Sequence, residues 1–297
     1  MKLYIGQQMI LPVLESVTLR KSRSEAAATL TATVLLAAAD TYLQKPSLGL
    51  GDAVRMLDDN GSEVFLGNIH ELERTPERVT IIAYDCGIYL TRNELRGAYF
   101  GDGADIVRQV AEDLGIAVGT VETGPEMRFA AAYLGDTAFS ILRQALGDAY
   151  EISVRKNALC VTRSAYIVYS LQPSQILEVS GTASLAGMVN RCIVVDRTGI
   201  VCGSAENNAN AAAYGQFQTI LRSDGSNPDM QAQAALAGRR LSGEVTILGH
   251  LNYRCGAAVE LHCGDWGLDG VYAVTASEHR WDAGLYTTRM KLEFIRE

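Results

Sequence analysis

The chain has little of what an exported, metal-binding or membrane-spanning protein needs. Its 297 residues include six prolines, two tryptophans and four histidines. No run reaches the ~20 consecutive apolar residues of a membrane-spanning helix. The N-terminal segment carries a single lysine, Lys2, and its short apolar runs are interrupted by Gly6 and Pro12. We therefore expect neither a signal peptide nor a membrane span.

The six cysteines are scattered and include no C-x-x-C pair. Structural zinc sites and redox centres use tighter, paired spacings. In a chain of this size without an export signal, free buried thiols are the usual state. We expect no disulfide, no metal and no cofactor. The cysteines are Cys86, Cys160, Cys192, Cys202, Cys255 and Cys263.

Positive charge is also in short supply. The chain holds 34 acidic and 26 basic residues, a formal net charge of −8. The bulk of such a surface repels nucleic acid, so we expect no specific nucleic-acid binding, and a local basic patch stays open as an alternative. With 48% hydrophobic residues, the chain can form about two or three domains with real cores.

Residues 1–85 have the pattern of an antiparallel β-meander. Ala28–Val34 alternates apolar residues with threonines, which favours a strand over the helix its alanines would allow. Ala53–Leu57 and Val64–Glu73 flank the pair Asn60-Gly61, which tolerates the positive φ of hairpin turns. A second turn leads into a strand at Val79–Tyr84.

Residues 86–165 predict a small α/β unit. Ala104–Gly115 and Asp136–Tyr150 each place apolar residues on one helical face. A hairpin should then turn at Lys156-Asn157.

Residues 166–297 return to β structure around one long helix. Asn227–Gly243 is predicted as that helix, with Asn227 at its N-cap and Pro228 in its first turn. The strands are expected in Met188–Gly199, Tyr214–Ser223, Glu244–Gly249, Ala257–Cys263, Gly270–Trp281 and Tyr286–Ile295.

Two segments of the chain resemble each other. Each has a Gly-led strand, a Gly/Asp turn, a long strand ending in charges, a turn and a closing strand. Hairpins share turn chemistry, so chance similarity and true duplication both stay open at this point. The matched positions are Gly51 with Gly256, Ala53 with Ala258, Val54 with Val259, and Thr80 near Thr287.

Catalytic motifs are missing. The sequence has no G-x-S-x-G, no H-E-x-x-H, no Walker loop and no full G-x-G-x-x-G. Asp58–Glu63 and Gly264–Gly270 carry carboxylates, but they suit hairpin turns better than calcium loops. Acidic residues are too numerous to choose a hydrolytic pair. We name no catalytic, cofactor-binding or metal residue; the histidines considered are His70, His250, His262 and His279, with Cys255 and Cys263 nearby in sequence.

A family resemblance ties these elements together. The stretches LGLGDAVRM, EVFLGNIHELER and VTIIAYDCGIYLTRNE, followed by ADIVRQVAEDLGI, resemble the XkdQ/YqbQ-like phage tail proteins. The later stretches TAFSILRQAL, MVNRCIVVD, YGQFQTILRSD and GVYAVTASEHRWDAGLYTTRMKLEF come in the family's order. The family is related to the baseplate hubs of contractile tails and to the hub region of the type VI secretion spike.

The resemblance implies a mainly β fold with an inserted α/β domain: two tube-like antiparallel β-barrels plus a small α/β domain. The first barrel would be residues 1–85, the α/β domain 86–165, and the second barrel 166–297, with discontinuous boundaries allowed. It implies a homotrimeric ring that joins a hexameric tail tube, or a tube initiator, to the central spike, with baseplate wedge proteins and a tape-measure protein as further partners. The ring would be assembled in the bacterial host cytoplasm and would lie in the tail baseplate. Its lumen is expected to be acidic enough to repel DNA.

Two other functions remain as alternatives. A tail-associated peptidoglycan hydrolase would need a clustered His, Cys and carboxylate site. A β-sandwich binding module would need an exposed aromatic platform, for which Trp266 and Trp281 are the tryptophans present. The low charge of the Ala-rich segment 229–240 also puts in doubt any transfer of the family's interface salt bridges.

Overall fold

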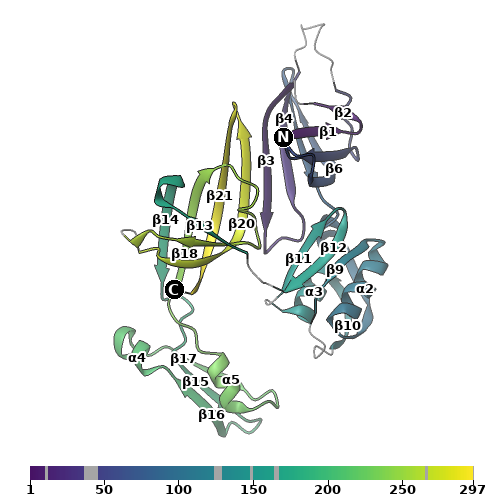
Figure 1. Ribbon diagram of the computed structural model, residues 1–297. Helices are drawn as coiled ribbons and strands as arrows, with labels where there is room; N and C mark the ends of the chain where they lie inside the picture. Colours follow the sequence, from purple (N-terminus) through teal and green to yellow (C-terminus); the bar gives the residue numbers. More distant parts are fainter. Residues whose placement is uncertain are drawn as a thin grey trace.

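The computed structural model describes residues 1–10, 13–36, 46–123, 129–147, 150–163, 167–264 and 267–296. These residues form a mainly β structure in which one large curled sheet carries two smaller units at its lower end (Figure 1). In the described parts of the chain, no helix is long and apolar enough to span a membrane.

The large sheet has thirteen strands in the order β14-β18-β21-β20-β3-β4-β7-β6-β5-β1-β2, and β19 joins both β20 and β13. We call its two parts the first half and the second half. The first half contains β1 (Lys2–Ile5), β2 (Gln8–Met9), β3 (Leu14–Ser22), β4 (Thr29–Leu35), β5 (Ala53–Leu57), β6 (Glu63–Arg74) and β7 (Arg78–Tyr84). The second half contains β13 (Val168–Leu171), the short 3-10 helix η2 (Pro173–Gln175), β14 (Ile176–Ser184), β18 (Arg240–Leu248), β19 (Ala258–Leu261), β20 (Gly270–Asp282) and β21 (Leu285–Arg296).

Each half of the sheet curls around its own hydrophobic core. In β4, Leu30, Ala32 and Val34 are buried in the first core, while the threonines between them lie on the opposite face. This alternation confirms the predicted strand. The second core contains Tyr272 and Met290. One face of the sheet therefore covers a core in both halves. We call the opposite face the polar face, on which Ile82 and Tyr84 of β7 also lie.

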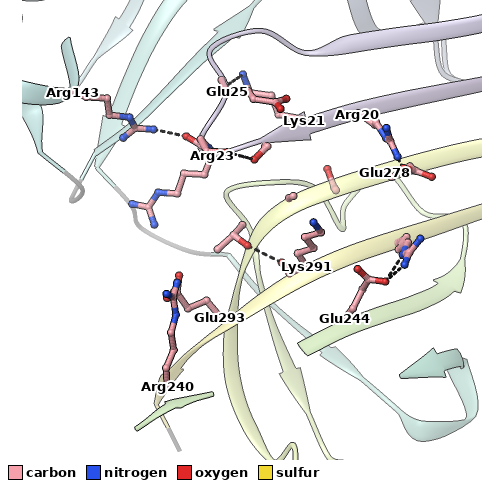
Figure 2. Close-up of a pocket in the computed structure, with 16 residues that line it drawn as sticks. Arg20, Lys21, Arg23, Glu25, Arg143, Arg240, Glu244, Glu278, Lys291 and Glu293 are labelled. Atoms are coloured by element: carbon pink, nitrogen blue, oxygen red, sulfur yellow. Dashed lines mark hydrogen bonds and ion pairs between the residues drawn. The ribbon is translucent and has the colours of Figure 1, made fainter. Parts of the chain in front are cut away.

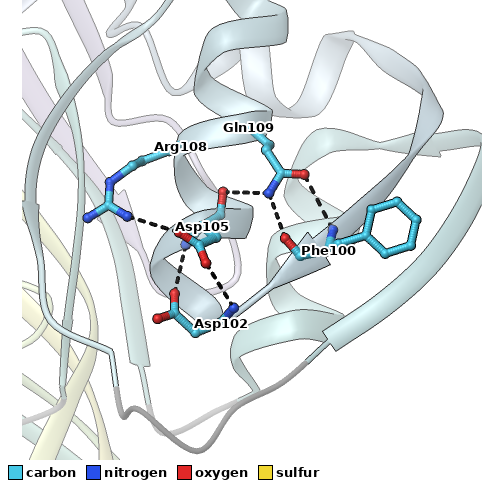
Figure 3. A network of polar contacts seen from close by, with 5 residues as sticks. All are labelled: Phe100, Asp102, Asp105, Arg108 and Gln109. Carbon is cyan, nitrogen blue, oxygen red and sulfur yellow. Dashed lines mark hydrogen bonds and ion pairs between the residues drawn. The ribbon is translucent and has the colours of Figure 1, made fainter.

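The α/β unit lies between the two halves in sequence. Asp102 caps α2 because its side chain accepts a hydrogen bond from Asp105 N at 2.9 Å, while Asp105 accepts one from Asp102 N at 3.3 Å (Figure 3). Gly115 ends the helix in the left-handed conformation, as predicted. The elements are α1 (Ile88–Arg92), β8 (Glu94–Gly101), α2 (Gly103–Leu114), β9 (Ala117–Val121), β10 (Phe129–Thr137), α3 (Ala138–Leu146), β11 (Tyr150–Arg155) and β12 (Ala158–Arg163).

Both predicted hairpin turns form. Gly61 has φ 83°, and Lys156 and Asn157 have φ 48° and 58°. Two consecutive positive φ values are those of the turn whose twist matches antiparallel strands. Local turn chemistry therefore sets the register of β5–β6 and β11–β12.

A second small unit is inserted between β14 and β18, where we had expected strands around one long helix. It contains β15 (Arg191–Val195), β16 (Val201–Glu206), α4 (Asn208–Tyr214), β17 (Gln218–Arg222) and α5 (Pro228–Ala234). The small sheet has the order β16-β15-β17, and α5 packs against β15 and β16.

The predicted helix Asn227–Gly243 is correct at its start and wrong in its extent. The Asn227 side chain accepts hydrogen bonds from the backbone N–H groups at the start of α5. The helix ends at Ala234, and β18 begins at Arg240. Gly243 lies within β18, opposite Gly181 of β14. Tertiary pairing has overridden the helix propensity of the alanines.

The two halves of the large sheet repeat each other in strand order and register. The pairs β3–β4, β4–β7, β6–β7 and β5–β6 correspond to β14–β18, β18–β21, β20–β21 and β19–β20. Bulges recur at the same places, between Leu14 and Ser16 as between Ile176 and Glu178, and between Ile69 and Glu71 as between Val274 and Ala276. β1 and β13 differ, because β1 is antiparallel to β5 and β13 is parallel to β19.

Backbone hydrogen bonds show that residues matched between the two segments in sequence also occupy equivalent positions in the structure. Gly51 N donates to Ile69 O at 2.8 Å, and Gly256 N donates to Val274 O at 3.0 Å. Both glycines have positive φ, 85° and 87°. The two segments that resemble each other in sequence therefore also match in topology and register. The pairing Ala53↔Asn68 matches Ala258↔Ala273, and Thr80 corresponds to Arg289, two positions beyond Thr287.

One pair of equivalent positions shows how the halves have diverged. Leu36 N donates to Glu77 O, and the equivalent Gly249 N donates to Tyr286 O. A Cβ on Gly249 would lie 2.0 Å from Cγ of Tyr286. The second half therefore needs glycine here because an aromatic ring covers the position.

Gly249→Ala should lower the free energy of unfolding by about 1–3 kcal/mol, since the Tyr286 ring must move away from an overpacked position. Chemical denaturation measures the change. Gly238→Ala is the matched control, because its Cβ would meet Asn210 Nδ2 only at 3.8 Å. Equal stability of the two variants would contradict this account of the ring.

Candidate assembly surface

The two halves join through one strand pair. β3 and β20 are antiparallel from Ser22↔Ala276 to Ser16↔Asp282, and Arg23 N donates to Thr275 O at 2.8 Å. Arg20 Nε lies 2.5 Å from Glu278 Oε2 across this pair. We call the β3–β20 pairing the internal joint. It makes two repeated halves into a single sheet.

The chain also carries unpaired counterparts of the two strands that form the internal joint. β14 corresponds to β3 and, within the described residues, pairs with β18 alone. Residues Glu71–Arg74 of β6 correspond to Ala276–His279 of β20. β5 pairs with β6 only as far as Asn68, so this stretch has no strand on its second side in the part of the chain described. β14 and β6 lie at opposite sides of the sheet (Figure 1).

An unpaired strand edge exposes a row of backbone donors and acceptors that pairs readily with another chain. The two open edges differ from each other. The edge of β14 is equivalent to that of β3, and the end of β6 is equivalent to the part of β20 that β3 pairs with, so the two open edges are complementary. Superposing the halves places Thr182 opposite Glu73, as Arg20 lies opposite Glu278. This arrangement suits head-to-tail association of identical chains.

Asp85, the residue where the first half passes into the α/β unit, is buried with 5% of its surface exposed. Its Oδ1 accepts a hydrogen bond from Gly87 N at 2.9 Å. Burial raises the pKa of Asp85, and the nearby Lys21 ammonium opposes that rise. Burial likewise raises the pKa of Glu151, with Lys21 again the largest opposing charge. The positive charge of Lys21 therefore favours the ionised forms of two carboxyl groups, that of buried Asp85 and that of half-buried Glu151, where the α/β unit meets the sheet.

The histidines and cysteines considered from the sequence do not form a metal site. Among the described residues, no three His, Cys, Asp or Glu side chains come together in a group that could hold an ion. His262 is exposed, with Nε2 3.8 Å from Glu260 Oε2. His70 packs edge-on against Tyr84 at 5.3 Å between ring centroids. Cys255 and Cys263 are buried free thiols.

Unlike His262, His279 is buried, and it lies in an aromatic cluster. Its Nδ1 lies 3.0 Å from Tyr286 Oη and 3.1 Å from Thr288 Oγ1. Trp281 stacks on Tyr286 at 4.3 Å between centroids, so its ring is engaged within the β20–β21 hairpin rather than in an open platform. Trp266 lies outside the described residues. The turn at Asp58 is a hairpin turn, closed by Ser62 N donating to Asp58 Oδ1 at 2.7 Å.

Burial lowers the pKa of His279 to about 4, and the charges of Arg254 and His250 add to this effect. A folded pKa below the unfolded value means that the neutral imidazole stabilises the fold. That contribution is fully present above about pH 6.5 and is lost as the pH falls toward about 4.

His279→Gln removes this titration, so the free energy of unfolding of the variant should fall less on acidification than that of the wild type. We expect the wild-type chain to lose roughly 2 kcal/mol more than the variant between about pH 7 and about pH 5. Denaturation curves at each pH give the difference. His262→Gln, at an exposed side chain, is the matched control and should follow the wild type. Parallel profiles for His279→Gln and wild type would show that His279 does not titrate in this way.

Solved structures with a similar fold include tail proteins and a component of a type VI secretion system. A 43 kDa tail protein of prophage MuSo2 from Shewanella oneidensis matches 99% of this chain and 97% of its own, with a TM-score of 0.76 and 14% identity. A tail protein from Neisseria meningitidis MC58 has a TM-score of 0.72 and 12% identity over 98% and 95% of the two chains. The Escherichia coli c3393 protein, a component of the type VI secretion system, has a TM-score of 0.60 and 11% identity over 100% and 78%.

These TM-scores show a shared fold. The profile of the YQBQ-like family matches residues 17–293, and the chain belongs to that family. This confirms the resemblance seen in the sequence. Among curated proteins, none matches the chain by sequence.

Proposed function

We propose that the protein is a non-enzymatic structural hub of a phage tail baseplate or of a tail-like injection particle. The observation that carries the proposal is the internal joint together with the two open edges that would rebuild it between chains. Family membership supports a role in the tail.

The hub is a homotrimeric ring. β14 of one chain pairs with Glu71–Arg74 of the next, and this contact copies the internal joint. A head-to-tail contact forms a closed ring when its rotation divides a full turn, and it otherwise forms an open filament. Because each chain contributes two similar halves, three chains present a pseudo-hexameric sheet. That symmetry suits a hexameric tube on one side and a trimeric spike on the other.

Within the ring, the two halves act as tube-like barrels, with each apolar face closed over its own core. Residues 86–165 form the α/β domain on the outside, and residues 185–239 add a further unit within the second barrel region. The polar face of the sheet lines the lumen. The partners are the tail tube or its initiator, the central spike, wedge proteins and the tape-measure protein. Assembly takes place in the host cytoplasm.

The purified protein should have three times the 32.1 kDa mass of the chain, either alone or when mixed with its spike partner. Native mass spectrometry or light scattering measures this. A monomer under both conditions, or a dimer, would contradict the trimeric hub and leave the fold unaffected.

Glu73→Cys combined with Thr182→Cys should give disulfide-linked oligomers up to the trimer on oxidation. In the internal joint, Arg23 and Thr275 form a hydrogen-bonded pair, so Arg20 and Glu278 form a non-hydrogen-bonded pair. Such pairs have Cα atoms about 4.5 Å apart, within disulfide range. Cys202→Ser removes the exposed thiol from the background.

The matched control replaces Leu72 instead of Glu73. A shift of one residue puts the thiol on the other face of the sheet, so Leu72→Cys with Thr182→Cys should stay unlinked. Equal linking of both pairs, or linking of the control alone, would overturn the proposed register. Trimers that form without linking the first pair would keep the ring and reject this edge contact.

A further inference from the structure

The polar face of the sheet has a groove beside the internal joint that the ring alone does not explain. It measures about 950 Å³. β20 and β21 form its floor, and the end of β3, the start of β18 and Arg143 of α3 border it (Figure 2). The charged residues that line it are Arg20, Lys21, Arg23, Arg143, Arg240, Arg289, Lys291, Glu25, Glu244, Glu278 and Glu293. We call it the basic groove.

Basic side chains outnumber acidic ones in this groove seven to four, although the whole chain has a net charge of −8. Three of its carboxylates are already paired: Glu278 with Arg20, Glu244 with Arg289, and Glu293 with Arg240. Lys291 is exposed and has no ion-pair partner among the described residues. In the proposed ring, this part of the polar face would make the lumen locally basic, in contrast to the acidic lumen expected from the net charge.

The three exposed ion pairs of the groove add little to the stability of the fold. Arg20, Arg240 and Arg289 have side chains 66%, 65% and 57% exposed, and ion pairs in such positions contribute little stability. The repeat makes the same point, because five of the charged positions have uncharged equivalents in strands that pair in the same way, whereas Glu278 corresponds to Glu73. Arg289 corresponds to Thr80, Lys291 to Ile82, Glu244 to Thr31, Glu293 to Tyr84 and Arg20 to Thr182.

We propose that the basic groove binds an acidic peptide segment of a partner protein in an extended conformation. The polar lining argues against an apolar small molecule, since such ligands bind in mainly apolar pockets. Peptide carboxylates can lie between the paired arginines and reach Lys291, where charge-assisted hydrogen bonds form. Nucleic acid fits less well, because every nucleotide carries a phosphate and some phosphates would lie against the four glutamates. A peptide can place uncharged residues opposite the glutamates.

In the proposed ring, the groove occurs once per chain and has no counterpart at the contacts between chains. The charge pattern is therefore three-fold on a pseudo-hexameric sheet. This inference rests on the proposed function for that copy number alone, because every lining residue of the groove comes from one chain. A partner with three-fold symmetry can fill all three grooves at once.

Fluorescence anisotropy tests the groove with a short labelled peptide of alternating Glu and Gly, at low ionic strength. We expect saturable binding of one peptide per chain that weakens with added salt. Lys291→Glu should weaken it about 10-fold, because one attraction becomes a repulsion. Arg197→Glu makes the same change of net charge at an exposed turn outside the groove and should bind like the wild type.

Equal weakening by Lys291→Glu and Arg197→Glu would overturn the proposal, since only the overall charge would then matter. No binding by the wild type would overturn it as well. An oligothymidylate of the same charge that competes as well as the acidic peptide would replace the peptide by nucleic acid. Native mass measured on the same samples keeps a failed groove distinct from a failed ring.

Discussion

The structure depends on the backbone pairing of β3 with β20. This pairing joins residues as far apart in sequence as Arg20 and Glu278, 258 positions, and it turns two separate curled sheets into one. Without it, each half would end in unpaired strands. Because the two halves share one register, β14 and the end of β6 are equivalent to β3 and β20. These two edges lie at opposite sides of the sheet, so each can form the same pairing only with another copy of the chain.

Local features of this fold could be predicted from sequence, and long-range ones could not. The threonine alternation of β4, the turn at Asn60-Gly61 and the helix that ends at Gly115 are set by neighbouring residues. The helix from Asn227 was predicted too long, because alanine composition does not report that Arg240 starts a strand paired with β14 and β21. The repeat was visible as Gly51 beside Gly256, but no sequence pattern indicates that β3 pairs with β20.

The candidate site was predicted less well than the fold. The sequence pointed to the four histidines as candidates; in the structure His279 is buried beside Tyr286, whereas His262 is exposed. The groove was missed because its basic residues come from β3, α3, β18 and β21, and no short window of sequence contains them together. Aligning the two halves by register would have revealed it, since Lys291 and Ile82 then occupy equivalent positions.

Residue-resolved hydrogen exchange of β14 tests the central claim most directly. In the internal joint, Arg23 N donates to Thr275 O, so the alternate residues Lys21 and Leu19 also direct their amides toward β20. Their counterparts in β14 are Ala183 and Gly181. Our account predicts that the amides of Gly181 and Ala183 exchange slowly in the assembled protein and quickly in the separated chain. Those of Ser180 and Thr182, which face β18, should stay protected in both. Fast exchange at Gly181 and Ala183 in the assembled protein would contradict a sheet that continues from one chain to the next.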